Sequence, residues 1–277
     1  MPASLLALAA SLSWGSSNFI AGLQSRRRSV WTVAAVSHIA SVLSAAVVLL
    51  FAGPWSLGVG QILWAIFAGI AGAGAVLALY RALTIGAMSV VSPIIAVQVV
   101  IPVAAGLSLG ERPALIAYVG MVLAAAGVVL VSRTGENRGS DVPRAAILLA
   151  LLTAVLYGFM LVGLDQAGRG NQFWAVLIVR AVSACAVLGY FVASRKRFQM
   201  TAKAVPALAT VGVLLTAATI LFTAAAAMGS LSVVAVLGSL SPVVTVALAQ
   251  VFLRERLGRR QWVGVAVVLA AVVLLTV

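Results

Sequence analysis

Long apolar segments run through the whole chain and restrict what it can fold into. A helix of roughly 20 apolar residues satisfies its own backbone hydrogen bonds while it crosses the hydrocarbon core of a membrane. The segments here are far longer than the alternating strands of a barrel and are rich in Ala, Leu and Val. We therefore predict an all-α polytopic membrane protein with ten transmembrane helices, over residues 2–24, 30–52, 58–83, 87–110, 113–132, 143–166, 172–194, 204–227, 231–253 and 259–277.

The composition agrees with a membrane protein. Hydrophobic residues make up 64% of the 277 residues and charged residues 8%, which leaves too little polar surface to cover a water-soluble globule. The net charge of +13 does not indicate nucleic-acid binding, because the cations lie between the apolar segments rather than on one face beside aromatic residues. The expected surroundings are a lipid bilayer, with no nucleic-acid partner.

Motifs for chemistry are missing from the sequence. The one cysteine, Cys185, has no second cysteine for a disulfide or a metal cluster. The chain contains no HExxH, no Cys/His cluster, no paired carboxylates and no Walker loop. We therefore expect neither an enzyme nor an ATP-driven pump, and no metal or cofactor.

The chain divides into two similar halves at its longest polar break. Shifting the sequence by 143 positions aligns Trp14-Gly15 with Tyr157-Gly158 and Trp31 with Trp174, and a shift of 144 aligns Glu111-Arg112 with Glu255-Arg256. Each half holds five predicted helices, and an odd number makes the second copy enter the membrane from the opposite side. The prediction is a first five-helix repeat over 1–132, a polar linker over 133–142 and a second, inverted five-helix repeat over 143–277, an architecture typical of secondary transporters.

The distribution of cations predicts the orientation of these helices. Only Arg112 and Arg169 lie in the connections on one side, and Arg81 and Arg180 fall inside helices. Short basic loops stay in the cytoplasm, so both termini should face the periplasm. The connections on the other side hold fourteen of the eighteen cations: Arg26, Arg27, Arg28, Arg133, Arg138, Arg144, Arg195, Lys196, Arg197, Lys203, Arg254, Arg256, Arg259 and Arg260.

Three motifs carry a resemblance to a known family. They are the Trp14-Gly15 pair, the Ser239-Leu-Ser-Pro242 stretch and the Leu253-Arg-Glu-Arg-Leu257 stretch. Over its whole length the chain resembles the drug/metabolite transporter superfamily, EamA-type, and is most similar to exporters of the YddG kind. That resemblance implies export of aromatic and other neutral amino acids across a bacterial inner membrane. The chain departs from the family pattern in the fourth helix. The family has a proline near position 98, and this chain has Gln98 there instead.

Aromatic and polar residues in the middle of predicted helices are the candidates for a solute pathway. Trp14 lies near the middle of the first helix, where an indole N–H that faced lipid would lose a hydrogen bond. A position facing a cavity and a position between packed helices both satisfy this requirement. Asn18 lies one turn further along the same helix face.

His38 and Arg180 are the most costly residues to place inside the membrane. Each lies about eight residues into its helix, at related positions in the two halves. Such residues normally face a water-filled cavity or a partner. The alternatives are that Arg180 extends its side chain to the nearer interface, and that His38 only joins two helices by a hydrogen bond.

A central cavity between the two halves is the predicted binding site. An aromatic wall of Trp14, Tyr80 and Tyr157 would suit apolar side chains, and Arg180 or Gln98 would meet a carboxylate. The stripe formed by Thr216, Thr219 and Thr223 either lines this pathway or bonds the preceding carbonyls. The full set of candidate residues is Trp14, Asn18, His38, Tyr80, Gln98, Tyr157 and Arg180.

The placement of carboxylates bears on how transport would be driven. Glu111, Glu136, Asp141, Asp165 and Glu255 all fall at helix ends or in loops, whereas proton-coupled transporters commonly hold an acid in the membrane interior. We therefore predict a facilitator that works by alternating access, with a monomer as the simplest assembly. The alternatives are a proton-coupled drug/metabolite antiporter that uses His38, and a channel-like pore.

Overall fold

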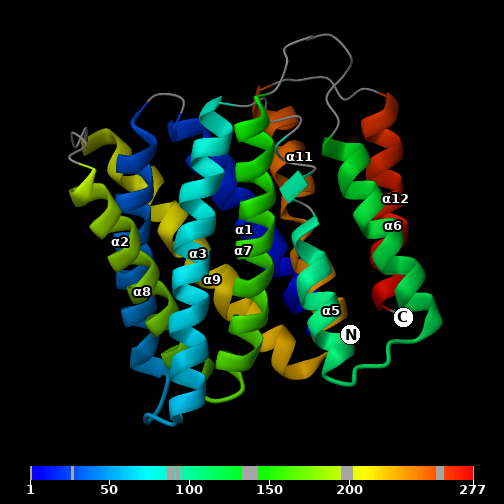
Figure 1. The fold of residues 1–277 in the computed structure, drawn as a ribbon, viewed down its shortest axis with the longest axis horizontal. Coiled ribbons are helices and arrows are strands. Elements are labelled where there is room, and N and C mark those ends of the chain that lie inside the picture. Colours follow the sequence, from blue (N-terminus) through cyan, green and yellow to red (C-terminus); the bar gives the residue numbers. More distant parts are fainter. Residues whose placement is uncertain are drawn as a thin grey trace.

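The fold is a bundle of long helices. The computed structural model describes residues 2–25, 28–85, 91, 94–95, 97–132, 143–194, 202–253 and 259–276, and all regular secondary structure in these residues is helical (Figure 1). The predicted linker over 133–142 lies outside them. In chain order the elements are α1 (Pro2–Ser25), α2 (Val30–Val48), η1 (Leu49–Phe51), α3 (Val59–Ile85), η2 (Val97–Val99), α5 (Val100–Ser108), α6 (Leu115–Ser132), α7 (Arg144–Gly168), α8 (Gln172–Ala193), η3 (Ala202–Ala204), α9 (Val205–Met228), α10 (Leu231–Gly238), α11 (Ser241–Leu253) and α12 (Arg259–Thr276).

The helical class of membrane protein is confirmed. Among the described residues, five helical stretches are long and apolar enough to cross a membrane: Val30–Phe51, Val59–Leu79, Arg144–Gly168, Gln172–Ala193 and Val205–Met228. Shorter apolar helices cover Val97–Ser108, Leu115–Gly127, Leu231–Thr245 and Trp262–Ala271. The total of ten transmembrane helices stays a prediction.

The ninth predicted helix is interrupted near its middle. α10 ends at Gly238, two residues form a turn, and α11 begins at Ser241, directly before Pro242. A proline lacks the N–H that an uninterrupted helix needs, and it is tolerated in a first turn. The turn at Ser239 and Leu240 thus divides this predicted helix into two pieces, with the proline in the first turn of the second.

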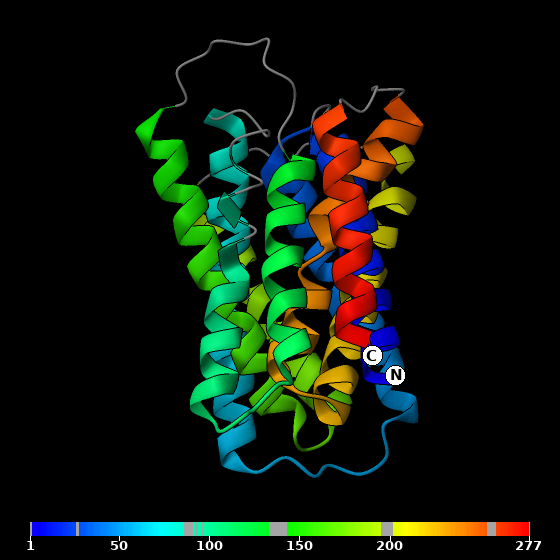
Figure 2. The ribbon, with the colours of Figure 1, turned by 90° about the vertical axis from the view of Figure 1, so that its right-hand side faces the viewer.

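Small residues let the helices approach closely. α1 packs along α9, α3 along α7, α2 along α8, and α6 along α12 (Figures 1 and 2). The largest buried cluster consists mainly of Ala, Val and Leu side chains and includes the fully buried Phe222. Because lipid tails are as apolar as these side chains, such helices associate through close packing rather than through exclusion of water.

Two glycines mark further close approaches between helices. A Cβ atom at Gly15 would lie 2.5 Å from Val244 Cβ and 2.8 Å from the carbonyl oxygen of Ser241. A Cβ atom at Gly158 would lie 2.7 Å from Ile101 Cβ and 2.8 Å from the carbonyl oxygen of Gln98. At both positions the neighbouring helix backbone occupies the space that any other residue would need.

The packing at Gly15 predicts a difference between two substitutions in α1. Gly15→Ala forces α1 away from α11 and should destabilise the protein by about 1–3 kcal/mol, the usual cost of overpacking. Gly22→Ala is the matched control, because nothing lies within 4 Å of a Cβ atom there. Thermal melting in detergent measures both. Equal melting temperatures for the two variants would show that α1 and α11 do not pack this closely.

Candidate solute-binding site

Arg180 is a buried cation in the middle of the bundle. Its side chain on α8 is only 7% exposed, and Nη2 donates a hydrogen bond of 2.7 Å to the carbonyl oxygen of Leu215 on α9. Its Nε has no hydrogen-bond partner within the described part of the chain. The guanidinium is therefore enclosed between helices rather than exposed on the outside of the bundle. A buried guanidinium with unused donors is costly unless an anion or water meets it.

His38 lies on α2 near Arg180. The side chain is 3% exposed, its Nδ1 lies 2.9 Å from the carbonyl oxygen of Ala34, and it interacts electrostatically with Arg180. A carbonyl oxygen can only accept, so Nδ1 carries the hydrogen and Nε2 of the neutral ring is an acceptor. The bond to Ala34 stays within α2, which leaves Nε2 as the ring atom able to meet a solute.

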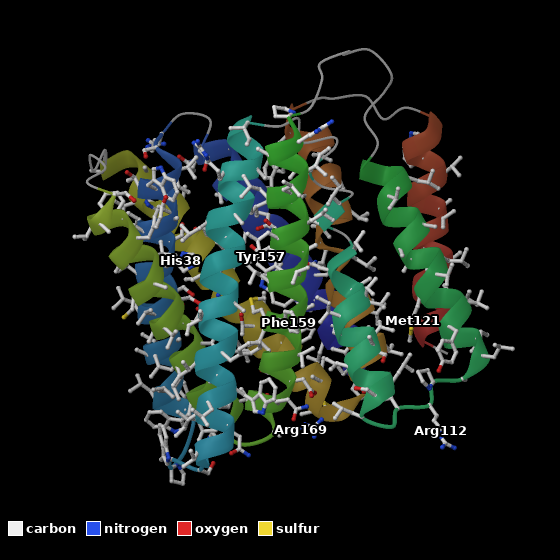
Figure 3. The ribbon with its side chains drawn as sticks, viewed as in Figure 1. His38, Arg112, Met121, Tyr157, Phe159 and Arg169 are labelled. Carbon is white, nitrogen blue, oxygen red and sulfur yellow. The ribbon has the colours of Figure 1, made fainter. Side chains whose placement is uncertain are left out.

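Tyr157 belongs to the same region. It is half-buried on α7, lies within electrostatic range of Arg180 and is at about the level of His38 in the bundle (Figure 3). His38 and Tyr157 thus both lie in the neighbourhood of Arg180, each on a different helix, and we call these three residues the polar cluster.

Hydroxyl groups between α2 and α9 border the polar cluster. Thr216 Oγ1 donates to the carbonyl oxygen of Ser41 at 2.8 Å and accepts from Ser44 Oγ at 2.8 Å. The Oγ atoms of Ser41 and Thr216 are 2.9 Å apart. Ser37 Oγ is buried without a partner among the described residues. The sequence analysis did not single out Ser37, Ser41 and Ser44, although their spacing places them on one face of α2.

Trp14 on α1 contacts a different part of α9 from the one that binds Arg180. Its ring centroid is 5.6 Å from that of Phe222, and the indole also approaches Gly238 at the end of α10. Seven residues separate Leu215, which accepts the Arg180 bond, from Phe222. At 1.5 Å per residue this is about 10 Å along α9. The Leu215 carbonyl that binds Arg180 and the Phe222 ring that contacts Trp14 are thus about 10 Å apart along the axis of α9.

The remaining candidate residues, Gln98, Asn18 and Tyr80, differ in how far they are buried. Gln98 is buried in η2, with its carbonyl oxygen against Gly158, the neighbour of Tyr157. Asn18 on α1 is exposed, so it is not part of a buried site in this structure. The side chain of Tyr80 lies outside the described part.

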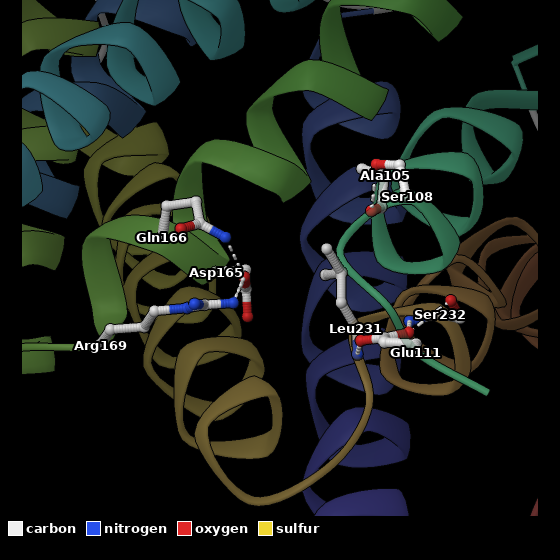
Figure 4. Close-up of polar contacts among 8 residues, drawn as sticks. All are labelled: Ala105, Ser108, Glu111, Asp165, Gln166, Arg169, Leu231 and Ser232. Carbon is white, nitrogen blue, oxygen red and sulfur yellow. Dashed lines mark hydrogen bonds and ion pairs between the residues drawn. The ribbon is translucent and has the colours of Figure 1, made fainter. Parts of the chain in front are cut away.

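Two carboxylates near helix ends make specific contacts, and one of them, Asp165, is buried. Asp165, four residues from Arg169, is 5% exposed; its Oδ2 accepts from Arg169 at 3.1 Å and from Gln166 at 2.8 Å (Figure 4). Glu111 bonds the first residues of α10. The ion pair of Asp165 and Arg169 could be predicted from the sequence, because residues four positions apart lie on one face of a helix. The contact of Glu111 with Leu231 could not, because it joins residues 120 positions apart.

Within the described residues, no three His, Cys, Asp or Glu side chains are placed to hold a metal ion. Glu136, Asp141 and Glu255 lie outside the described part. The chemistry that this site offers is recognition of a polar group by hydrogen bonds and charge, in a bundle of helices that suits a membrane. Buried charged and polar groups inside an apolar helical bundle are typical of membrane proteins that move polar solutes.

The chain belongs to the EamA-like transporter family. The model of that family matches residues 1–133 and again residues 144–277. The protein is therefore a membrane transporter of small molecules, in a family of transporters rather than enzymes. One solved crystal structure has a similar fold, with a TM-score of 0.80 and 17% sequence identity over 99% of this chain and 96% of that chain. No curated protein matches the sequence.

The hydroxyl contacts between α2 and α9 predict the effect of Thr216→Val. The substitution keeps the shape of Thr216 but removes the donor to Ser41 and the acceptor for Ser44. It should lower the free energy of unfolding by about 1–2 kcal/mol. Thr210→Val, on an exposed turn of the same helix, is the control and should have little effect. Thermal melting of both variants makes the comparison, and an unchanged Thr216→Val protein would mean that these hydroxyls do not hold α2 and α9 together.

Proposed function

We propose that the protein exports amino acids, aromatic and other neutral ones, across a bacterial inner membrane by alternating access. The observation that carries this proposal is Arg180, a buried guanidinium with an unpaired Nε in the middle of the bundle. A guanidinium binds a carboxylate with two parallel hydrogen bonds, which is the strongest pairing available to such a group.

The surroundings of Arg180 suit the rest of an amino acid. Nε2 of neutral His38 accepts a hydrogen bond and would meet the α-ammonium group. The ring pair of Trp14 and Phe222, about 10 Å along α9 from the Leu215 carbonyl, would meet an apolar or aromatic side chain. The two described carboxylates are the neighbour of Arg112 (Glu111) and the partner of Arg169 (Asp165), and both arginines lie at one end of the bundle (Figure 3), so neither carboxylate would compete with the solute for Arg180.

Alternating access would follow from ten membrane spans arranged as two inverted five-helix repeats. The double match of the family model, to 1–133 and to 144–277, supports the repeat. The glycine contacts support it as well, because the offset of 143 relates Gly15 to Gly158, Ser241 to Gln98 and Val244 to Ile101. Packing of α1 on α9 corresponds in the same way to packing of α7 on α3. Rocking of one half against the other would expose the polar cluster to each side in turn.

The orientation of the helices follows from the cations. Arg112 and Arg169 lie at one end of the bundle, and the N- and C-termini are displaced toward that same end (Figures 1 and 3). The sequence assigns fourteen cations to the connections on the opposite side. Short loops rich in Lys and Arg stay in the cytoplasm, so that side would be the cytoplasmic one. Both termini would thus face the periplasm.

Transport of L-phenylalanine into proteoliposomes tests the role of Arg180. Arg180→Gln should raise KM by about tenfold or more, because a charge-assisted hydrogen bond to the carboxylate is lost. Arg180→Lys, which keeps the charge, should recover part of the affinity, and Arg112→Gln, at an exposed position, should change nothing. The melting temperature should not fall with KM, since a neutral side chain is easier to bury than a charged one. A normal KM together with a lower melting temperature would make Arg180 a structural residue.

The lack of a described acid near the polar cluster predicts facilitated transport. A pH gradient imposed on proteoliposomes without a substrate gradient should drive no accumulation of L-phenylalanine. Uphill accumulation that disappears in His38→Gln would instead support a proton-coupled antiporter with His38 as the proton carrier. The control is Asp165→Asn, which removes the buried carboxylate of α7 and should leave transport without dependence on the pH gradient.

A further inference from the structure

Glu111 connects the two halves of the chain at one end of the bundle. Its Oε1 accepts a hydrogen bond of 2.5 Å from the backbone N–H of Leu231. Its Oε2 accepts from the backbone N–H of Ser232 at 3.0 Å and from Ser232 Oγ at 2.6 Å (Figure 4). The first N–H groups of a helix have no partner within it, and a negative charge there is stabilised by the helix dipole. A side chain from the first half therefore caps α10 of the second half.

Two glycines build this contact. Gly110 has a φ of +91°, which reverses the chain after α5 and allows the Glu111 N–H to bond the carbonyl oxygen of Gly106 at 3.0 Å. A Cβ atom at Gly106 would fall on the Glu111 carboxylate and within 2.5 Å of Ser232 Oγ. Glycine at 106 is thus what leaves room for the carboxylate between α5 and α10.

We propose that the contact of Glu111 with Leu231 and Ser232 is a latch that closes this end of the transporter and breaks in each cycle. This inference rests on the alternating access of the proposed function. α10 is the short first piece of the interrupted ninth helix, and its last residue, Gly238, lies beside Trp14. Because Glu111 holds the first residues of α10, it also restrains the last residue, Gly238, which borders Trp14 at the aromatic end of the proposed site. Releasing it would open a route between α5 and α10.

The sequence repeat makes this latch unequal at the two ends. Glu111 and Ser232 have counterparts in Glu255 and Ser89. The two glycines have none: an offset of 143 relates Gly106 and Gly110 to Ala249 and Leu253, and an offset of 144 relates them to Gln250 and Arg254. The space that Gly106 provides for the carboxylate is therefore encoded in one half only. The protein should rest with the end that carries Glu111 closed.

Thiol labelling tests the latch without a transported substrate. Ser239 is buried at the break between α10 and α11, and its Oγ has no partner in the described part of the chain. In a Cys185→Ala background, Ser239→Cys is treated in intact cells with a membrane-impermeant thiol reagent. Ser56→Cys, on the exposed connection before α3, is labelled in parallel to establish which side of the membrane this end faces. If Ser56→Cys is protected in cells, inside-out vesicles are used instead.

Breaking the latch should speed the labelling of Ser239→Cys. Glu111→Gln should raise the rate about fivefold, because hydrogen bonds to a charged acceptor are about twice as strong as neutral ones. Ser232→Ala, which removes a single donor and leaves both backbone bonds, should raise it less. Arg112→Ala, the exposed neighbour of Glu111, is the control and should leave it unchanged.

Labelling rates that are the same in all these folded variants, or no labelling in any of them, would overturn the latch. Should Glu111→Gln fail to fold, the comparison of Ser232→Ala with Arg112→Ala decides the question alone. If the labelling responds as expected but no amino acid is transported, the proposed substrate is wrong and the latch stands.

Discussion

Close contact between helices at small residues is the constraint on which the structure depends. Inside a membrane, exclusion of water gives helices no reason to associate, so packing and hydrogen bonds must hold them together. Gly15 and Gly158 let α1 and α7 lie against the backbone of the interrupted ninth helix and of the fourth predicted helix. Larger residues at these two points would separate the elements that surround the polar cluster. Packing of small residues thus determines where the charged and aromatic groups meet.

The polar cluster stands out because the rest of the bundle is so apolar. A guanidinium buried among Ala, Val and Leu is costly, and one hydrogen bond to the Leu215 carbonyl offsets only part of that cost. The unused donor of Arg180 and the acceptor Nε2 of His38 are the groups on which the proposed recognition of an amino acid depends. The same cost explains why the hydroxyls of Ser41, Ser44 and Thr216 bond one another between α2 and α9.

Much of the fold could be predicted from the sequence, because hydrophobicity acts locally. The apolar segments predicted the described helices, whereas the interruption of the ninth helix before Pro242 was found only in the structure. The sequence also singled out His38, Tyr157 and Arg180, since charged and polar residues inside apolar helices are rare, and their role in a solute-binding site stays a prediction. It left open whether Arg180 reaches the interface, because burial depends on neighbouring helices. The contact of Glu111 with Ser232 could not be predicted, since it joins two halves of the chain through backbone groups that carry no sequence signal.

Counterflow in proteoliposomes tests the carrier mechanism most directly. Vesicles loaded with unlabelled L-phenylalanine are diluted into a trace of labelled L-phenylalanine. A transporter that exposes one site alternately to each side predicts transient accumulation of label above its equilibrium level, and saturation of the initial rate with concentration. Label that enters only to equilibrium, with a flux that rises linearly with concentration, would contradict alternating access and indicate a channel-like pore.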